Sequence, residues 1–285
     1  MKQRITSAIA GLSVLVVAIL FFDTLLVNCL AALICVLAVF ELFNAAGLTR
    51  YRMLAGVSAL YCVMLLFLNT RPVSLLFLPL SLFYVVFCFC YLLAEHESLN
   101  VRDLCYCFLT TILVAMSFYS LMQMRDESTP QLGLFYLILS FGSAWWSDSG
   151  AYFVGTFLGK HKLCPAISPK KTVEGLVGGI LTAVVFNLLV CWVFVSISNT
   201  IVPYGYFVDE VQINFLAVAL LTPVLSMLGV LGDLSASVIK RQCGIKDFGH
   251  IMPGHGGIMD RFDSVLFISP VIFLIFRVFP LISIL

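Results

Sequence analysis

The chain has 285 residues, of which 61% are hydrophobic and only 11% are charged, and its mean hydropathy is +1.08. Soluble domains carry about 25% charged residues, so this composition excludes an ordinary soluble domain and favours lipid as the surrounding medium. The formal net charge of +1 says little by itself, so the distribution of the charges along the chain matters more, and we expect no nucleic-acid partner. The ten cysteines include no C-x-x-C pair and lie mostly in apolar runs, which is typical of small buried hydrophobic residues.

Apolar runs long enough to cross a bilayer, about 20 residues each, follow one another along the chain. The first starts after Met1-Lys-Gln-Arg4 and has no signal-peptide cleavage site before Asp23, so we expect it to be retained. The predicted spans cover roughly residues 5–22, 25–46, 53–69, 74–94, 103–123, 132–153, 173–198, 212–231 and 264–283. We therefore predict an all-α integral membrane protein with about nine transmembrane helices in one membrane domain, 1–285. Residues 1–131 would be scaffold spans, and 132–285 would carry the active site.

The positive charges indicate how these spans are oriented, because cytoplasmic loops are enriched in Lys and Arg. With the N-terminus in the cytoplasm, thirteen of the sixteen Lys and Arg residues fall on the cytoplasmic side, and only Arg71, Arg125 and Arg277 fall on the other. The same orientation puts the two longest polar segments, about 154–172 and 232–263, on the cytoplasmic face. We expect the plasma membrane of a bacterium, with the active site facing the cytoplasm.

A first polar cluster lies late in the sixth predicted span, in Trp145-Trp-Ser-Asp-Ser-Gly-Ala-Tyr152. Asp148 and Tyr152 are four residues apart and would share a helix face. An acid inside a membrane helix usually faces a polar cavity or a partner, so Asp148 is either a site residue or a structural acid paired with a base.

A second cluster is the basic loop from Gly155 to Gly175, which contains Ser168-Pro-Lys-Lys-Thr172. Ser168 followed by Pro169 predicts a helix N-cap and first helical residue, so that Lys170, Lys171 and Thr172 would ring a helix N-terminus that favours an anion. The alternative is a solvated basic loop at the membrane surface. The glycine pairs Gly175 and Gly179, or Gly155 and Gly159, would permit close helix packing.

The third cluster runs from Gly232 to Asp263. Asp233, Ser237 and the pair Lys240-Arg241 would line one stripe of a helix, and Asp260 and Asp263 would share a face if the ninth helix begins there. The glycine-rich stretch 253–257 would allow the backbone to approach a ligand closely. His255 lies within it and is a candidate hydrogen-bond donor to a phosphate, a general acid or a packing residue.

Such alternation of acids and bases indicates a metal-assisted transfer of a phosphate group. Aspartates suit Mg²⁺, which shares oxygen ligands with substrate phosphates, and Lys and Arg suit the phosphates themselves. The cluster therefore predicts phosphoryl or nucleotidyl transfer.

The third cluster also resembles the signature of the phosphatidate cytidylyltransferase family. The resemblance rests on Ser237-Val-Ile-Lys-Arg241, Lys246-Asp247, Pro253-Gly-His-Gly-Gly257 and Asp260-Arg-Phe-Asp263, which span 27 residues with the spacing intact. Asp148-Ser-Gly-Ala-Tyr152 and Ser168-Pro-Lys-Lys-Thr-Val-Glu-Gly175 agree with it too. Met252 replaces a family Leu, Ile or Phe, and Ala236 stands where many members have Glu.

The resemblance implies the reaction of CTP with phosphatidic acid to give CDP-diacylglycerol and pyrophosphate, with Mg²⁺, by a homodimer in the lipid bilayer. It implies Asp233, Asp260 and Asp263 as metal-site acids. It also implies phosphate binding by basic residues, which are Lys170, Lys171, Lys240, Arg241 and Lys246. Asp247 and Asp263 are candidates for a second cation or for orienting these bases, and Ser168, Thr172, Ser237, His255 and Arg261 are further substrate-binding candidates.

Two other functions are weighed against this one. A CTP-dependent lipid kinase, such as a dolichol kinase, would transfer the γ-phosphate to an alcohol and would need a base for that hydroxyl. A transporter or channel would use the intramembrane acids along a permeation path, but it is disfavoured because no internal repeat is visible and the polar residues gather at one face.

Overall fold

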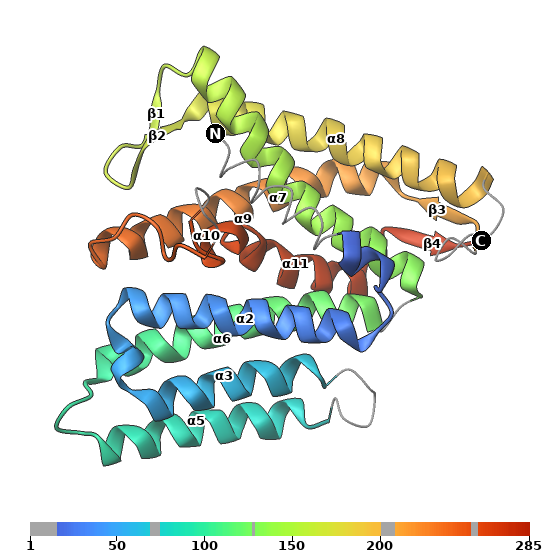
Figure 1. Cartoon of the computed structure of the whole chain (residues 1–285). Coiled ribbons are helices and arrows are strands. Elements are labelled where there is room, and N and C mark those ends of the chain that lie inside the picture. The colour runs from blue at the N-terminus through green and yellow to red at the C-terminus, as the bar shows by residue number, and fades with distance from the viewer. Residues whose placement is uncertain (1–15, 69–74, 127–128, 201–208, 252–255) are drawn as a thin grey trace. The chain divides into compact units, whose positions relative to one another are not determined.

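A computed structural model describes residues 16–68, 75–126, 129–200, 209–251 and 256–285 of the chain (Figure 1). It is mostly helical, as predicted. The helices are α2 (Leu25–Ala45), η1 (Leu48–Arg50), α3 (Arg52–Leu66), α5 (Phe77–Ala94), α6 (Val101–Asp126), α7 (Pro130–Leu158), α8 (Val173–Thr200), α9 (Phe215–Gln242), α10 (Met259–Phe262) and α11 (Val265–Val278). A helix satisfies its backbone hydrogen bonds within one segment, which is what an apolar run in lipid requires.

Five helices in the described part of the chain are long and apolar enough to cross a membrane. They are α2, α5, α6, α8 (as Val173–Asn199) and α9, while α3 and α11 are shorter apolar helices. These helices are those of a membrane protein. The total of nine spans and the cytoplasmic N-terminus stay predictions, and most of the first predicted span, 5–22, lies outside the described residues.

Two short two-stranded antiparallel sheets add strands that the sequence did not predict. β1 (Lys162–Cys164) pairs with β2 (Ser168–Thr172), and β3 (Val211–Ile213) pairs with β4 (Ile282–Ile284). The prediction of a helix over 264–283 was therefore wrong at its end, because α11 stops at Val278 and the chain turns into β4. The tyrosine hydroxyl of Tyr136 accepts a hydrogen bond of 2.9 Å from the backbone of Leu281, which fixes this turn.

The chain forms two compact units, and the first comprises Met1–Met122 with Lys240–Phe262. Helix α2 packs against α3, and α3 packs against α5. Polar side chains join these apolar helices at buried points. Asn28 of α2 donates to the carbonyl of Leu66 at 2.8 Å, and the hydroxyls of Ser58 and Tyr84 are 2.8 Å apart. Such interhelical hydrogen bonds help to hold membrane helices together.

The second unit comprises Gln123–Ile239 with Asp263–Leu285. Its main contact is between α7 and α8, which lie along one another (Figure 1). Glycines allow this approach, as predicted for Gly155, Gly175 and Gly179. A Cβ added to Gly175 would lie 3.2 Å from Cα of Gly155, and one added to Gly179 would lie 2.6 Å from the carbonyl oxygen of Ser147. Gly159 follows the end of α7.

Candidate active site

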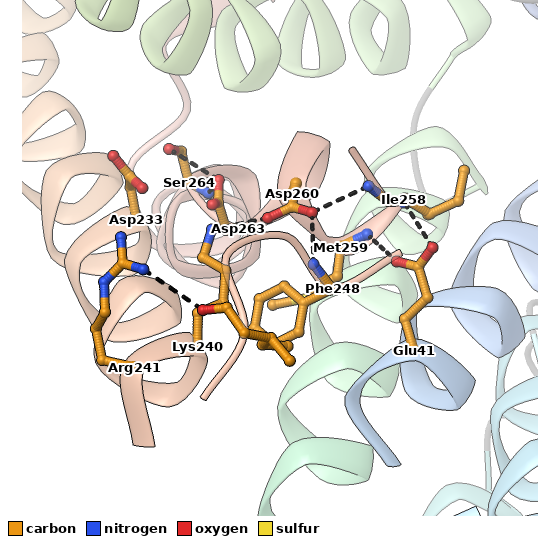
Figure 2. A network of polar contacts seen from close by, with 12 residues as sticks. Glu41, Asp233, Lys240, Arg241, Phe248, Ile258, Met259, Asp260, Asp263 and Ser264 are labelled. Carbon is orange, nitrogen blue, oxygen red and sulfur yellow. Dashed lines mark hydrogen bonds and ion pairs between the residues drawn. The ribbon is translucent and has the colours of Figure 1, made fainter. Parts of the chain in front are cut away.

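Asp260 is the best-connected acid of the first unit. It lies on α10, and its Oδ1 receives a hydrogen bond of 2.7 Å from Nζ of Lys240, near the end of α9. Its Oδ2 accepts backbone hydrogen bonds from Phe248 at 2.9 Å and Gly257 at 3.0 Å. The Lys240 and Asp260 side chains are only 11% and 6% exposed. The structure thus pairs Asp260, which we expected to be a metal-site acid, with Lys240, which we expected to bind phosphate (Figure 2).

The end of α9 explains how Lys240 meets a residue twenty positions later. Gly244 has φ of 70°, a conformation that suits glycine, and the backbone amide of Ile245 donates to the carbonyl of Lys240 at 2.9 Å. This αL ending satisfies a free carbonyl and reverses the chain. The segment after it returns Phe248 to Asp260, and Nζ of Lys240 lies 5.3 Å from the Phe248 ring centroid.

The glycines next to α10 approach carboxylates of the chain itself. Gly256 has φ of 87°, and a Cβ added to it would lie 2.9 Å from Oδ2 of Asp260. A Cβ added to Gly257 would lie 2.6 Å from Cδ of Glu41. The sequence predicted that the backbone of this stretch approaches a ligand closely. In its described part, glycine is required by the contacts with Asp260 and Glu41, which belong to the chain itself.

Glu41 of α2 is a residue that the sequence reasoning assigned to the scaffold. Its side chain is buried, and its carboxylate accepts hydrogen bonds from the backbone amides of Ile258 at 3.0 Å and Met259 at 2.8 Å. Its position within an apolar helix could have identified it, because ionisable residues inside membrane helices usually belong to functional sites or pair with a specific partner.

Other predicted residues of the first unit lie at its surface. Arg241 is exposed, and its Nη1 donates to the carbonyl of Ile245 at 3.4 Å. Lys246, Asp247 and Arg261 are exposed as well. His255 lies outside the described residues, as does most of the glycine-rich stretch before Gly256.

In the second unit, Asp233 of α9 forms an ion pair with Lys171 of β2, and both side chains are about one-quarter exposed. Ser237, one turn after Asp233, is buried on α9. Lys170 is exposed. The predicted stripe of Asp233, Ser237, Lys240 and Arg241 therefore does lie on one helix.

The predicted N-cap at Ser168 was wrong. Residues Ser168–Thr172 form strand β2, in which Ser168 pairs with Cys164 and Thr172 pairs with Lys162, and α8 begins only at Val173. A residue before proline disfavours helical geometry, so Ser168-Pro169 extends the chain here. Thr172 is the residue at the helix start, and its hydroxyl accepts a hydrogen bond of 3.1 Å from the amide of Gly175, as an N-cap does.

Asp148 and Asp263 meet at Ser264 in the second unit. The Ser264 hydroxyl is 3.4 Å from Oδ2 of Asp148 and 3.5 Å from Oδ1 of Asp263, and Oδ1 of Asp263 also accepts the Ser264 amide at 2.8 Å. Gly232, next to Asp233, packs against the backbone of Asp263. Asp260 and Asp263 do not share a helix, because α10 ends at Phe262 and α11 starts at Val265. Ser264 was missed because a lone serine carries no signal in the sequence.

The carboxylates fit a metal ion that is shared with a substrate. Across the described ranges, no three His, Cys, Asp or Glu side chains gather closely enough to hold a metal ion. Instead, each of Asp233 and Asp260 is matched by a lysine. Mg²⁺ is usually bound through one or two carboxylates together with substrate phosphates, so each unit offers a carboxylate of the kind that suits such an ion.

Comparison with known proteins agrees with this chemistry. The model of the cytidylyltransferase family matches residues 2–279. The chain belongs to this family. It is 34% identical to the phosphatidate cytidylyltransferase of Bacillus subtilis over 291 residues, 98% of each chain. It is also 34% identical to that of Staphylococcus epidermidis over 278 residues, 95% of this chain and 97% of the relative. As a member of the cytidylyltransferase family, the protein is a nucleotidyltransferase, an enzyme class that generally uses a divalent metal.

Proposed function

We infer that this protein is a membrane enzyme of phospholipid biosynthesis that transfers the cytidylyl group of CTP to phosphatidic acid, giving CDP-diacylglycerol and pyrophosphate. The observation that carries the inference is the end-to-end likeness to phosphatidate cytidylyltransferases. The signature residues support it, since Lys240 and Asp260 come together in one buried pair. A CTP-dependent lipid kinase is not favoured, because the relatives are named for cytidylyl transfer.

The reaction needs little base catalysis. The nucleophile is the phosphate of phosphatidic acid, whose second pKa is about 6, as for other phosphomonoesters, so it is largely dianionic at neutral pH. The difficulty is to bring two anions together. Lys170, Lys171, Lys240, Arg241 and Lys246 supply positive charge for this purpose and for the departing pyrophosphate. Positioning and electrostatic stabilisation then supply most of the rate.

We assign the metal-binding role to Asp233, Asp260 and Asp263, with Mg²⁺ as the ion. A bound Mg²⁺ would draw charge off the reacting phosphate and screen its repulsion from the nucleophile. Asp233 and Asp260 each form an ion pair with a lysine, and with an ion on the carboxylates these lysines would be able to bind substrate phosphates. Asp263 and Asp247 are the candidates for a second cation.

The remaining assignments follow from charge and signature. Ser168, Thr172, Ser237, His255 and Arg261 are assigned to substrate binding, with Asp148 beside them. The enzyme works as a homodimer in a bacterial plasma membrane and has about nine spans. Its N-terminus and active site face the cytoplasm, where CTP is found. The acyl chains of phosphatidic acid stay in the bilayer.

The test is turnover of α-³²P-labelled CTP with phosphatidic acid in detergent, with and without Mg²⁺. We expect label in the lipid fraction only when Mg²⁺ is present. Label from γ-³²P-CTP in lipid would instead establish a kinase. No lipid label from either nucleotide, beside an active control enzyme, would refute both activities.

A further inference from the structure

We propose that Glu41 is a positioning residue of the active site, which fixes the backbone from Gly257 to Asp260 and thereby sets the metal affinity of Asp260. The proposal rests on the metal-binding role proposed for Asp260. Glu41 lies on α2, 217 and 218 residues away from the two backbone amides that it binds.

The contacts of Glu41 are made by both carboxylate oxygens. Oε1 accepts the amide of Ile258 at 3.0 Å, and Oε2 accepts the amide of Met259 at 2.8 Å (Figure 2). Ile258 and Met259 are 6% and 4% exposed, so water does not replace these bonds. Hydrogen bonds to an ionised acceptor are about twice as strong as neutral ones, and two of them hold two successive peptide groups in one orientation.

The surrounding backbone is shaped to admit this carboxylate. Added Cβ atoms would lie 2.6 Å from Cδ of Glu41 at Gly257 and 2.8 Å from it at Gly249. Both distances are far below a normal carbon–carbon contact of about 3.5 Å. Gly249 and Gly257 therefore both approach the Glu41 carboxylate, from two separate positions in the chain. Packing of the apolar face of α2 alone would not require a carboxylate at this point.

The same peptide groups lead directly to Asp260. Gly257 donates its amide to Oδ2 of Asp260, and the next two amides are held by Glu41. In the proposed role, the Asp260 carboxylate binds a cation and releases Lys240, which requires that the backbone carrying Asp260 is held in place. Small displacements of active-site groups lower reaction rates by large factors. Glu41 supplies that fixed point from outside the signature sequence.

The first experiment measures hydrogen–deuterium exchange of a peptide covering 256–263 in detergent-solubilised full-length enzyme. In Glu41→Ala we expect the amides of Ile258 and Met259 to exchange roughly tenfold faster or more, the protection expected from one charge-assisted hydrogen bond. Glu41→Gln keeps one acceptor oxygen and should give an intermediate result. Asn28→Ala is the matched control, because it removes another buried hydrogen bond of α2 and should leave this peptide unchanged.

The second experiment titrates Mg²⁺ in the turnover assay with the same variants. We expect Glu41→Ala to raise the Mg²⁺ concentration for half-maximal rate and to lower kcat, with Glu41→Gln in between and Asn28→Ala like the wild type. Unchanged exchange in Glu41→Ala overturns the proposal, and so does faster exchange with an unchanged Mg²⁺ titration. Asp260→Asn distinguishes the metal-binding role of Asp260 from the positioning role of Glu41. Normal turnover of Asp260→Asn would overturn the metal-binding role and with it the link to Mg²⁺. An inactive Asp260→Asn together with unaffected Glu41 variants would overturn the role of Glu41 alone.

Discussion

At the scale of single residues, two aspartates of the candidate site are each paired with a lysine. Lys240 and Asp260 are both nearly inaccessible, and each neutralises the other. Removing one partner of a buried ion pair leaves the other charge without compensation and costs about 3–5 kcal/mol, whereas replacing both can be neutral. Stability and activity should therefore respond differently to substitutions at this pair.

We predict that Lys240→Met and Asp260→Asn each reduce turnover about a hundredfold or more, the effect of losing one electrostatic group of an active site. Lys240→Met should also lower thermal stability in detergent, because the Asp260 carboxylate stays buried without its lysine. The double variant should regain stability and remain inactive. Normal turnover of Asp260→Asn would refute its metal-binding role, and a double variant less stable than Lys240→Met would show that the pair is not coupled.

The residues of this pair could be predicted from the sequence, because the spacing of the signature is itself informative. Glu41 could not be tied to them, since nothing local connects α2 with a segment more than two hundred positions away. The ion pair between Lys171 and Asp233 was likewise not predictable as a contact, although both residues were named. Side-chain chemistry was thus visible in the sequence, while its pairing depended on the fold.

At the scale of elements, the end of α9 differs most from the predicted span 212–231, whereas α8 begins where the span 173–198 was predicted to begin. Helix α9 continues through the polar stretch to Gln242, because apolarity marks the lipid-embedded part of a helix and not its end. Helix α8 starts at Val173, after a hairpin that Ser168-Pro169 favours. The length of the apolar runs predicted most of the described helices, but short strands of three to five residues give too little pattern to detect.

The glycine contact between α7 and α8 gives a prediction at this scale. Gly179→Ala would place its Cβ 2.6 Å from the Ser147 carbonyl and 3.1 Å from Cβ of Ala151, and such overpacking costs about 1–3 kcal/mol. The matched control is Gly56→Ala in α3, where the added Cβ meets nothing within 4 Å, so the higher helix propensity of alanine should leave stability equal or higher. Thermal unfolding in detergent compares the two, and equal melting temperatures would contradict the packing argument.

At the scale of the whole molecule, the composition established a helical membrane protein, and its charges predict the orientation. The two strand pairs of the second unit make that orientation testable, since β2 precedes α8 and β3 follows it. With 28 residues, α8 is about 42 Å long at 1.5 Å per residue, which exceeds the hydrocarbon thickness of about 30 Å. The two strand pairs should therefore lie on opposite sides of the membrane.

We predict that a membrane-impermeant maleimide added to intact cells labels Gln212→Cys but not Lys162→Cys, in an active variant whose native cysteines have been replaced. Both side chains are exposed, one on β3 and one on β1, so accessibility to the reagent depends on the side of the membrane. Inverted vesicles should give the opposite pattern, and detergent should allow both to react. Labelling of Lys162→Cys alone in intact cells would reverse the predicted orientation. Labelling of both variants in intact cells would show that α8 does not place residues 162 and 212 on opposite sides of the membrane. The assignment of thirteen positive charges to the cytoplasm would then also be wrong.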